Sequence, residues 1–264
     1  MSNIFQDFFD YLDSFRHKDL FQNSGFLWEP LNRLGDYLPK LLIKLESKNS
    51  WEEPSNGFRK KLFLAKEGER KESCLIIEDW YEVKTPAFFP TLGIWISQGT
   101  IVEPTAIIKG PAIIGEFCDI RQGAYIRGNV LTGNRCVIGH ATEVKNSILM
   151  NNSESGHFNY IGDSIIGSYV NMGAGSKLAN LQFRSLKEKK EDAMHSIVIK
   201  CDGNAIETQR GKLGAILGDN VELGCNAVIC PGSFVGKNSI IYPNSCLPKG
   251  YYQPETTFGK LKKT

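Results

Sequence analysis

Residues 96–144 read ISQGTIVEPTAIIKGPAIIGEFCDIRQGAYIRGNVLTGNRCVIGHATEV. Every sixth position of this stretch, counted from its first residue, is aliphatic, with one exception at Thr132. These positions are Ile96, Val102, Ile108, Ile114, Ile120, Ile126, Thr132, Ile138 and Val144. Such a spacing fits neither the 3.6-residue period of a helix nor the 2-residue period of a flat strand, and it is typical of a parallel β-helix built from hexapeptides. We therefore predict that each short strand buries one aliphatic side chain before the chain turns a corner.

Small residues support this interpretation of the repeat. The positions two before the aliphatic row are Ile94, Thr100, Ala106, Ala112, Cys118, Ala124, Val130, Cys136 and Thr142. Three glycines, Gly115, Gly133 and Gly139, directly follow positions of this six-residue row. Glycine suits corners because a bulky side chain would crowd the turn and because some corners need a positive φ.

The same spacing returns nearer the C-terminus. It places aliphatic residues at Leu217, Leu223, Ile229, Val235, Ile241 and Leu247, and a short run lies between the two blocks at Ile166, Met172 and Leu178. A β-sandwich with tight turns is the alternative, but it would show simple alternation and irregular spacing. The sequence therefore favours a mainly β fold, a hexapeptide-repeat solenoid.

Composition narrows the class of protein. The chain has 264 residues, of which 41% are hydrophobic and 23% charged, and its net charge of +2 gives no reason to expect nucleic acid as a partner. None of the seven cysteines forms a C-x-x-C pair with partner histidines, so no metal site is expected. Two of them fill small-residue positions of the repeat, which favours a reducing cytoplasm. Residues 1–15 lack the pattern of a signal peptide, and no apolar run is long enough for membrane insertion.

The first 90 residues are expected to form a mostly helical region with a linker. Aromatic residues recur at helical spacing from Phe5 to Phe15, and a leucine stripe predicts a second helix from Pro30 to Leu45. We expect this apolar surface to pack on its own domain or on a sister subunit, with a ligand groove as the alternative. Residues 47–72 are interpreted as a linker or exposed excursion, residues 73–77 as a strand and PAFFP (86–90) as a break in regular structure. The region shows no glycine-rich phosphate loop, so we predict no nucleotidyltransferase domain in it.

Two interruptions divide the predicted solenoid domain, residues 91–250. The hexapeptide register slips after Val144, in front of NNSESGHFNYIGDS (151–164), where we expect function because loops that leave the coils can line a cleft. An inserted arm at 184–212 begins with a charged run and continues as a predicted hairpin at 196–208, with its turn at 202–204. The arm either reaches a neighbour or is a plain surface excursion. Residues 251–264 are expected to be a C-terminal tail. Its final lysines either belong to a frayed chain end or attract a phosphorylated cofactor.

Polar residues gather around the slip and could form a catalytic cluster. They are Arg127, Glu143, Lys145, His157, Tyr160, Asn171 and Asn180. Because one coil rises by about 4.8 Å, residues distant in sequence can stack on one wall. Arginine and lysine can grip a phosphate, a histidine can accept a proton near neutral pH, and backbone N–H groups at 173–175 could hold an oxyanion. The alternative at this point is that the histidine is structural and that the arginine–glutamate pairs only connect neighbouring coils.

Four motifs carry a family resemblance: YIRGN (125–129), TEVK (142–145), GHFNYIGDS (156–164) and NMGAGSKLAN (171–180). On these motifs the chain resembles the acetyltransferase half of the bifunctional N-acetylglucosamine-1-phosphate uridyltransferase/glucosamine-1-phosphate acetyltransferase family. The resemblance implies a left-handed β-helix that assembles as a homotrimer with active sites between subunits. It also implies acetyl-CoA as co-substrate, direct attack of a sugar amine on the thioester, and no metal for acyl transfer.

The resemblance assigns roles to individual residues. It implies that His157 is the general base and that Arg127 and Lys145 hold the sugar phosphate. Further implied roles are sugar contacts for Glu143, Tyr160 and Asn171, an oxyanion-binding N–H for Ala174, a place near the acetyl group for Asn180, and a coenzyme-side position for Ala174 and Cys225. The chain departs from the family pattern on the coenzyme side. Leu181 replaces an aromatic residue, Cys225 in LGCNA (223–227) replaces a serine, and the arm is extra.

The sequence therefore leads to one main hypothesis and two alternatives. The main hypothesis is an acetyl-CoA-dependent N-acetyltransferase that acts on an amino-sugar phosphate, with glucosamine-1-phosphate as the expected acceptor, in UDP-N-acetylglucosamine synthesis. The first alternative is a non-catalytic module that binds a sugar phosphate or a sugar nucleotide and partners a separate nucleotidyltransferase. The second alternative is a structural trimer scaffold.

Overall fold

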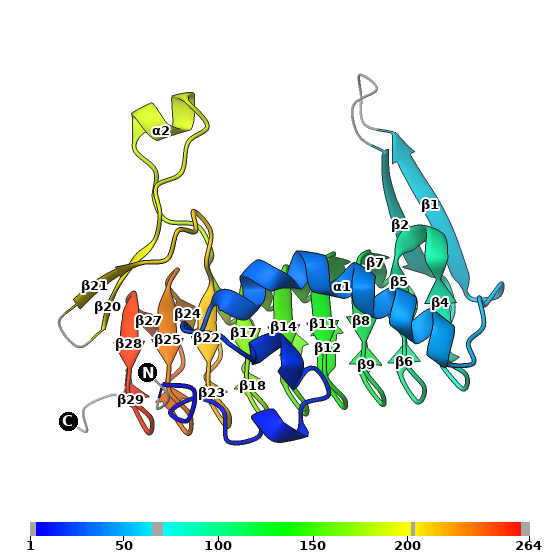
Figure 1. The fold of residues 1–264 in the computed structure, drawn as a ribbon, viewed down its shortest axis with the longest axis horizontal. Coiled ribbons are helices and arrows are strands. Elements are labelled where there is room, and N and C mark those ends of the chain that lie inside the picture. The colour runs from blue at the N-terminus through cyan, green and yellow to red at the C-terminus, as the bar shows by residue number, and fades with distance from the viewer. Residues whose placement is uncertain (1–3, 65–70, 202–203, 260–264) are drawn as a thin grey trace.

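The body of the protein is a parallel β-solenoid, as the hexapeptide spacing predicts (Figure 1). The structure is a computed structural model that describes residues 4–64, 71–201 and 204–259. Three nine-stranded sheets run along the solenoid, and consecutive strands of the chain pass from one sheet to the next. The mainly β, solenoidal fold class is confirmed, whereas the left-handed sense implied by the resemblance stays a prediction.

We name two of the sheets by what lies on their outer faces, the covered sheet and the polar sheet, and call the remaining one the third sheet. The covered sheet contains β4 (Ala87–Phe89), β5 (Ile94–Ile96), β8 (Ala112–Ile114), β11 (Val130–Thr132), β14 (Ser147–Leu149), β17 (Ile165–Ile166), β22 (Ala215–Leu217), β25 (Ser233–Val235) and β28 (Gly250–Tyr252). The polar sheet contains β1 (Phe58–Leu64), β2 (Lys71–Ile77), β7 (Ile107–Lys109), β10 (Tyr125–Arg127), β13 (Glu143–Lys145), β16 (Tyr160–Gly162), β19 (Lys177–Leu178), β24 (Val228–Ile229) and β27 (Cys246–Leu247). The third sheet contains β3 (Tyr81–Glu82), β6 (Ile101–Val102), β9 (Asp119–Ile120), β12 (Val137–His140), β15 (Glu154–His157), β18 (Asn171–Met172), β23 (Glu222–Leu223), β26 (Ile240–Ile241) and β29 (Thr257–Phe258).

The remaining elements lie outside the coils. They are the 3-10 helices η1 (Leu12–Ser14), η2 (Lys18–Phe21) and η3 (Pro90–Leu92), the helices α1 (Glu29–Lys48) and α2 (Leu186–Lys190), and the strands β20 (Val198–Cys201) and β21 (Asn204–Glu207). The strands β20 and β21 pair antiparallel, which confirms the predicted hairpin. Residues 202 and 203 of its predicted turn lie outside the described residues. Figure 1 shows the arm that carries α2 and the β1–β2 hairpin projecting to the same side of the solenoid, near its opposite ends.

The inner core is the aliphatic row that the sequence displays. Residues such as Ile108, Ile126, Val144 and Ile161 sit above one another on successive strands of the polar sheet and are completely buried. Each stacked aliphatic side chain removes apolar surface from water, at about 25 cal/mol per Å². Because every coil contacts only its neighbours, the core is a column of repeated layers.

The three glycines of the repeat are needed for a reason other than a positive φ. A Cβ on Gly115 would lie 2.0 Å from the carbonyl oxygen of Gly133, and one on Gly139 would lie 1.8 Å from that of Gly156. The glycines therefore permit close approach of neighbouring coils. Left-handed corners are formed mostly by other residues, and asparagine recurs among them, as at Asn129 and Asn146. Asparagine tolerates this conformation better than most residues.

The register slip between Val144 and Ile166 is the loss of one residue at each of two corners, because the inner residues Val144 and Leu149, and again Ile161 and Ile166, lie five rather than six positions apart. Strand β13 pairs with β10 with Val144 opposite Ile126, and with β16 with Val144 opposite Ile161, so the spacing shortens from 18 to 17 residues. The expected interruption at 151–164 is therefore wrong, because this segment stays within the coils as β15 and β16. A one-residue deletion shortens a corner without releasing a loop.

The N-terminal segment covers one face of the solenoid. Helix α1 begins one residue before Pro30 and extends past Leu45, as predicted, and it crosses the strands of the covered sheet (Figure 1). The aromatic part before it is not the continuous helix that we expected, but two 3-10 helices and turns. Backbone groups of this part bond to the solenoid instead, with the carbonyl oxygens of Asp7 and Phe8 accepting from Lys237 and Asp219. The apolar surface thus packs on its own domain.

Three further segments differ from expectation. Strand β1 occupies part of the presumed linker at 47–72, where it pairs antiparallel with β2. PAFFP contains β4, which pairs antiparallel with β5 and closes the end of the covered sheet. Coils also continue beyond residue 250 through β28 and β29, because Tyr252 and Phe258 pack against the inner core. The lysines at 260, 262 and 263 lie outside the described residues. Within the described part of the chain, no helix is both long and apolar enough to cross a bilayer.

Candidate functional site

The outer face of the polar sheet carries rows of polar side chains. On β10 and β13 the middle residue points inward, so the flanking residues point outward. Register places Tyr125, Glu143 and Tyr160 opposite one another on three successive strands. Arg127 follows Lys109 in a second row, and Lys145 lies one strand further along. Adjacent strands are separated by about 4.8 Å, so one small ligand can touch both rows.

Arg127 and Glu143 form an ion pair on this face. The Arg127 Nη1 donates to Glu143 Oε1 over 2.7 Å, and both side chains are about one-third or more exposed. The hydrogen bond to Glu143 raises the pKa of Arg127. Arg127 is therefore a fixed cation that is partly neutralised within the chain and still reachable by an anion.

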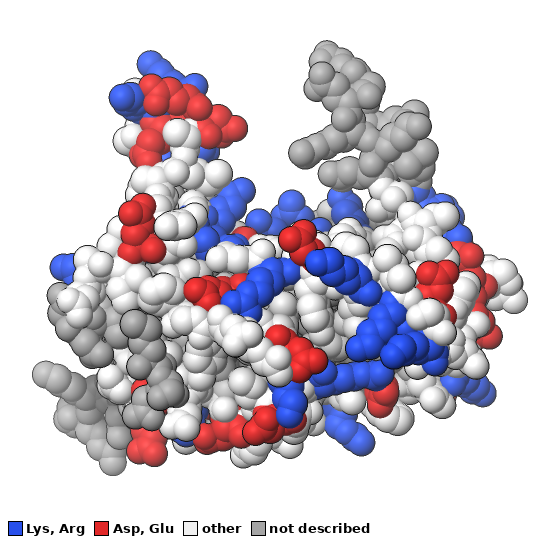
Figure 2. Space-filling model, in the orientation of Figure 1, with Lys and Arg blue, Asp and Glu red and all other residues white. Residues whose placement is uncertain are grey.

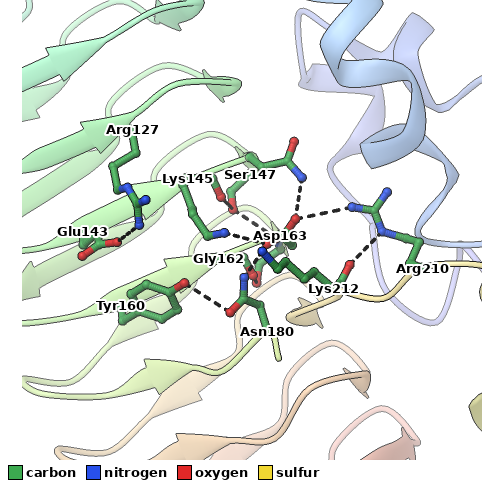
Figure 3. Close-up of polar contacts among 12 residues, drawn as sticks. Arg127, Glu143, Lys145, Ser147, Tyr160, Gly162, Asp163, Asn180, Arg210 and Lys212 are labelled. Atoms are coloured by element: carbon green, nitrogen blue, oxygen red, sulfur yellow. Dashed lines mark hydrogen bonds and ion pairs between the residues drawn. The ribbon is translucent and has the colours of Figure 1, made fainter. Parts of the chain in front are cut away.

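Lys145, Tyr160 and Asn180 are joined through a buried carboxylate, that of Asp163 (Figure 3). Asp163 Oδ2 accepts from Asn180 Nδ2 over 2.5 Å and lies 3.4 Å from Lys145 Nζ. The Tyr160 hydroxyl donates to Asn180 Oδ1 over 3.2 Å. Burial raises the pKa of Tyr160, so this phenol keeps its proton at neutral pH. The network fixes the Asn180 amide with its oxygen toward Tyr160 and its nitrogen toward Asp163.

The arm contributes an arginine to the same carboxylate. Arg210 Nη2 lies 3.5 Å from Asp163 Oδ1, which also accepts from Asn146 Nδ2 over 2.6 Å. Arg210 Nη1 donates to Asn32 Oδ1 over 2.5 Å and thereby connects the arm to α1. Burial lowers the pKa of Arg210, and Asp163 opposes that shift. An open cleft of about 460 Å³, bordered by Arg210 and Asp163, lies beside this contact.

Asp163 and Arg210 were missed by reasoning from the sequence. Asp163 lies inside GHFNYIGDS, so the motif was visible although its carboxylate was not singled out. Its left-handed φ of 50° placed it at a corner, where an acidic residue is unremarkable. Arg210 carried no local signal, because its contact with Asp163 depends on how the arm folds back.

His157 lies at the corner where the third sheet meets the polar sheet. It ends β15, three residues before Tyr160 begins β16, and it is exposed. Its N–H donates to Asn159 Oδ1 over 3.1 Å, and its carbonyl accepts from the Gly175 N–H over 2.9 Å. No partner of the His157 imidazole is found among the described residues. The ring is therefore reachable from solvent on a backbone that is held at both ends.

Ala174 lies one coil beyond His157. The neighbouring N–H groups of Gly173 and Gly175 donate to the carbonyls of Leu223 and His157. Within the described residues the N–H of Ala174 donates no hydrogen bond, whereas its carbonyl accepts from Asn226. Such an N–H is suited to stabilise a negatively charged oxygen.

The predicted residues therefore fall into two groups on adjoining walls, rather than on the one wall that we expected. Arg127, Glu143, Lys145, Tyr160 and Asn180 belong to the polar sheet and its corner. Asn171 and Cys225 belong to the third sheet and its corner. Asn171 Nδ2 donates to Glu222 Oε2 over 2.9 Å, and Cys225 is exposed one coil further on. His157 and Ala174 lie between the two groups.

The cysteines and acidic residues form no metal centre in the described part of the chain, where no group of three His, Cys, Asp or Glu side chains is placed to hold an ion. The cysteines whose side chains are described are thiols. Cys230 and Cys246 lie on adjacent coils with their sulfur atoms 3.8 Å apart.

Comparison with known proteins gives three results for the sequence. Residues 107–222 match the model of the GMPPB C-terminal domain. The chain is 35% identical over 162 residues to a bifunctional sugar-1-phosphate nucleotidylyltransferase/acetyltransferase of Sulfurisphaera tokodaii, over 54% of this chain and 38% of that protein. It is 40% identical over 126 residues to the bifunctional protein GlmU of Methanococcus vannielii, over 48% of this chain and 28% of that protein. The chain thus spans well under half the length of these relatives.

A solved structure of the polysialic acid O-acetyltransferase OatWY covers 60% of this chain and 79% of that chain, at 17% identity and a TM-score of 0.24, which is too low to support an argument. The resemblance to the bifunctional sugar-1-phosphate nucleotidylyltransferase/acetyltransferases is confirmed. Residues 107–222, which match the family model, lie in the solenoid and its inserted arm.

Proposed function

We propose that this chain is an acetyl-CoA-dependent N-acetyltransferase that acts on an amino-sugar phosphate, with glucosamine-1-phosphate as acceptor and UDP-N-acetylglucosamine synthesis as its context. The observation that carries the proposal is the pair of cations Arg127 and Lys145 on neighbouring strands of the polar sheet, together with the exposed His157 at the corner where the strands of that sheet begin. The relative from Sulfurisphaera tokodaii is a bifunctional sugar-1-phosphate nucleotidylyltransferase/acetyltransferase, which supports the same reaction class. We assign the reaction to the solenoid domain, residues 91–250.

The acceptor would bind on the polar sheet. Its phosphate would lie against Arg127 and Lys145, where the guanidinium offers a fork of N–H donors and the lysine a point charge. Its hydroxyls would meet Glu143 and Tyr160, which are opposite one another in register. Asn171 would contact the sugar from the third-sheet wall.

His157 would act as the general base. The imidazole accepts a proton from the sugar ammonium, and the free amine attacks the thioester carbonyl carbon, so that a C–N bond forms. The N–H of Ala174 would stabilise the negative charge on the carbonyl oxygen, and Asn180 would lie near the acetyl group. The C–S bond then breaks, and the departing coenzyme A thiolate takes the proton that His157 removed from the ammonium. The second proton, on the new amide nitrogen, is released to solvent.

The acyl donor would lie on the side of Cys225, one coil beyond Ala174. Cys225 would occupy the position next to the departing thiolate, and Leu181 and the arm would border the coenzyme. We further propose a cytoplasmic homotrimer, in which the acceptor is shared between the two walls of adjacent subunits. Acyl transfer of this kind needs no metal.

A non-catalytic binding module is the second candidate. It is favoured by the pairing of Arg127 with Glu143 and of Lys145 with Asp163, which lowers the net charge offered to a phosphate. In that case the chain would bind a sugar phosphate or sugar nucleotide and partner a separate nucleotidyltransferase.

A comparison of two histidines tests the proposal. His140 is the register partner of His157 on the preceding coil and serves as the matched control. Purified wild type, His157→Ala and His140→Ala are incubated with acetyl-CoA and glucosamine-1-phosphate, and the acetylated sugar is quantified by mass spectrometry. Because exposed thiols such as Cys225 react with thiol reagents, product rather than thiol is measured.

We expect His157→Ala to lower kcat/KM by at least about 100-fold, the usual effect of losing a general base. The His140→Ala variant should stay within about threefold of wild type. Equal losses in both variants would contradict the assigned base. Absence of product, together with a sugar-phosphate-dependent rise in Tm, would refute the enzyme and support the binding module.

A further inference from the structure

A second polar pocket lies on the covered face, away from the candidate site. It is enclosed between the C-terminal half of α1 and the turn that precedes and begins η2, and its volume is about 230 Å³. Arg16, His17, Tyr37, Lys44 and Lys48 are among the residues that line it. A separate small cavity of about 10 Å³ shares Arg16 and His17 with this pocket and is bordered on its other side by residues of the solenoid such as Ile113. The residues that line the 230 Å³ pocket all belong to the N-terminal segment, and those of the small cavity beside it include residues of the solenoid.

The charges around this pocket are mainly positive. Lys44 and Lys48 lie one turn apart on α1, and Arg16 approaches from the opposite wall. Neither lysine has an ion-pair partner among the described residues. Arg16 has a single long contact, 3.4 Å from its Nη1 to Glu116 Oε1, and one carboxylate of the pocket, that of Asp19, faces three cations. Figure 2 shows lysine and arginine side chains gathered over the C-terminal half of α1.

The inner wall of the pocket is an uncharged polar pair. His17 is 6% exposed, and its Nδ1 is 3.1 Å from the Tyr37 hydroxyl. No partner of the other ring nitrogen is found in the described part of the chain. Burial, followed by the charges of Arg16 and Lys44, lowers the pKa of His17 to about 4. His17 therefore offers a hydrogen-bonding nitrogen without adding a charge that would have to be desolvated.

We propose that this pocket binds a small phosphomonoester. Its dianionic phosphate would lie among Arg16, Lys44 and Lys48, which supply charge and N–H donors. Its organic part would lie against the Tyr37 ring and the aliphatic side chain of Leu41, which also lines the pocket. The volume is below the range of about 300–1,000 Å³ that is usual for drug-sized ligands, so it suits a molecule of the size of a monosaccharide phosphate.

This site is separate from the candidate acetyltransferase site. The acetyltransferase site occupies the polar sheet and the corner of the third sheet, whereas the pocket is lined by the N-terminal segment, which packs on the covered sheet. Helix α1 touches both places, since Asn32 near its start contacts Arg210 and Lys44 near its end lines the pocket. Binding in the pocket does not depend on acetyl transfer.

Calorimetric titration tests the proposal in a background that removes phosphate binding at the other site. Arg127→Ala/Lys145→Ala protein is titrated with ribose 5-phosphate, inorganic phosphate and ribose at constant ionic strength. The pocket variant is Lys44→Glu. The matched control is Lys40→Glu, on the preceding turn of the same helix and outside the pocket lining. Both lysines are exposed, so both variants should fold.

We expect saturable binding of ribose 5-phosphate that is at least fivefold tighter than that of inorganic phosphate, and no binding of ribose. Lys44→Glu should weaken it at least tenfold and Lys40→Glu less than twofold. Equal loss of affinity in Lys44→Glu and Lys40→Glu would contradict binding in the pocket, because it would indicate only a general attraction of the phosphate to the positive surface. Equal affinity for inorganic phosphate would contradict the proposed contact of Tyr37 and Leu41 with the organic part of the ligand. Absence of saturable binding would contradict the site itself. His17→Gln, which keeps a polar side chain, should reduce affinity less than Lys44→Glu.

Discussion

The covered sheet and the polar sheet come from the same repeat and enclose the same aliphatic column, yet they turn different chemistry outward. On the covered sheet the outward residues are apolar, as at Trp95, Leu131 and Ile148, and the N-terminal segment seals them. On the polar sheet the outward positions carry Arg127, Glu143 and their neighbours. On the covered sheet the middle residue of each strand points outward, whereas on β10 and β13 of the polar sheet the two flanking residues do.

This difference separates stability from function. Inner residues specify the solenoid on every face, so the outward residues are free to create either a packing surface or a polar wall. We therefore expect substitutions on the covered face to change mainly the free energy of unfolding. Those on the polar face should change mainly ligand binding and turnover.

The largest effect on the free energy of unfolding should come from a charge placed under the N-terminal segment. Ile148→Asp puts a carboxylate at a fully buried outward position of the covered sheet, and we expect a loss of about 4 kcal/mol in unfolding free energy. The control is Lys177→Asp on the exposed face of β19, with an expected change of about 0.5 kcal/mol. Urea denaturation measures both. Similar losses at the two positions would remove the distinction between the faces.

The contact between the N-terminal segment and the solenoid, which we call the seam, contains two groups whose titration should change the free energy of unfolding in opposite directions. His17 has a pKa lowered to about 4, so its stabilising contribution is lost as the pH falls from 6.5 to 4. Burial raises the pKa of Asp219 to about 6, so its contribution is present at low pH and is lost as the pH rises through 6. Asp219 Oδ2 accepts from the Tyr11 N–H over 2.8 Å, which places it at the same seam.

In wild type these two contributions should largely offset between pH 6.5 and 4. Because one pKa unit corresponds to about 1.4 kcal/mol, Asp219→Asn should lose about 3 kcal/mol of stability over this interval, and His17→Gln should gain a similar amount. Denaturation at a series of pH values gives the slopes. Parallel slopes in wild type and both variants would show that neither group titrates at the seam.

A smaller loss is expected where the arm meets the polar wall. Asp163→Asn keeps a residue that tolerates the left-handed backbone but weakens the contacts to Lys145 and Arg210, at a cost of about 2 kcal/mol. Limited proteolysis should then cleave the arm faster. Asp192→Asn is the control, because its ion pair with Arg184 is exposed and should contribute under about 1 kcal/mol. Unchanged proteolysis in Asp163→Asn would show that Asp163 does not anchor the arm.

The smallest effect on stability should come from the Arg127–Glu143 pair. Glu143→Gln removes an exposed ion pair, and we expect a change of under about 1 kcal/mol in unfolding free energy. The KM for the sugar phosphate should nevertheless change severalfold, because this face is proposed to bind it. A stability loss as large as that of Ile148→Asp would mean that the polar wall is structural.

Much of the fold was predictable because its signal is local and repeated. The aliphatic spacing from Ile96 to Val144 is visible in the sequence, since each coil uses the same inner position. The segment before α1 was misjudged because spacing does not reveal that Phe8 and Phe9 are both buried against a preformed surface. Helical spacing predicts one buried stripe, whereas an irregular segment can bury adjacent residues.

The candidate site was predictable only in part for a related reason. Arg127 and Lys145 lie on strands whose register follows from the repeat, so their proximity could be anticipated. The contact between Arg210 and Asp163 depends on the path of the arm, which no repeat specifies. The pairing of Lys145 with Asp163 was hidden as well, because it follows from the shortened corner after Val144.

The arm also shows how this scaffold can acquire new parts. Asn171 on β18 faces Glu222, 51 positions later, whereas Glu154 faces Asn171 after an ordinary coil. The strands on either side of the insertion still pair in parallel register, so the extra residues leave and re-enter at one corner without disturbing the stack. Loop-closure entropy grows only slowly with length, which makes such additions inexpensive. An evolving or engineered solenoid can therefore exchange a whole recognition element at a corner while every inner residue stays the same.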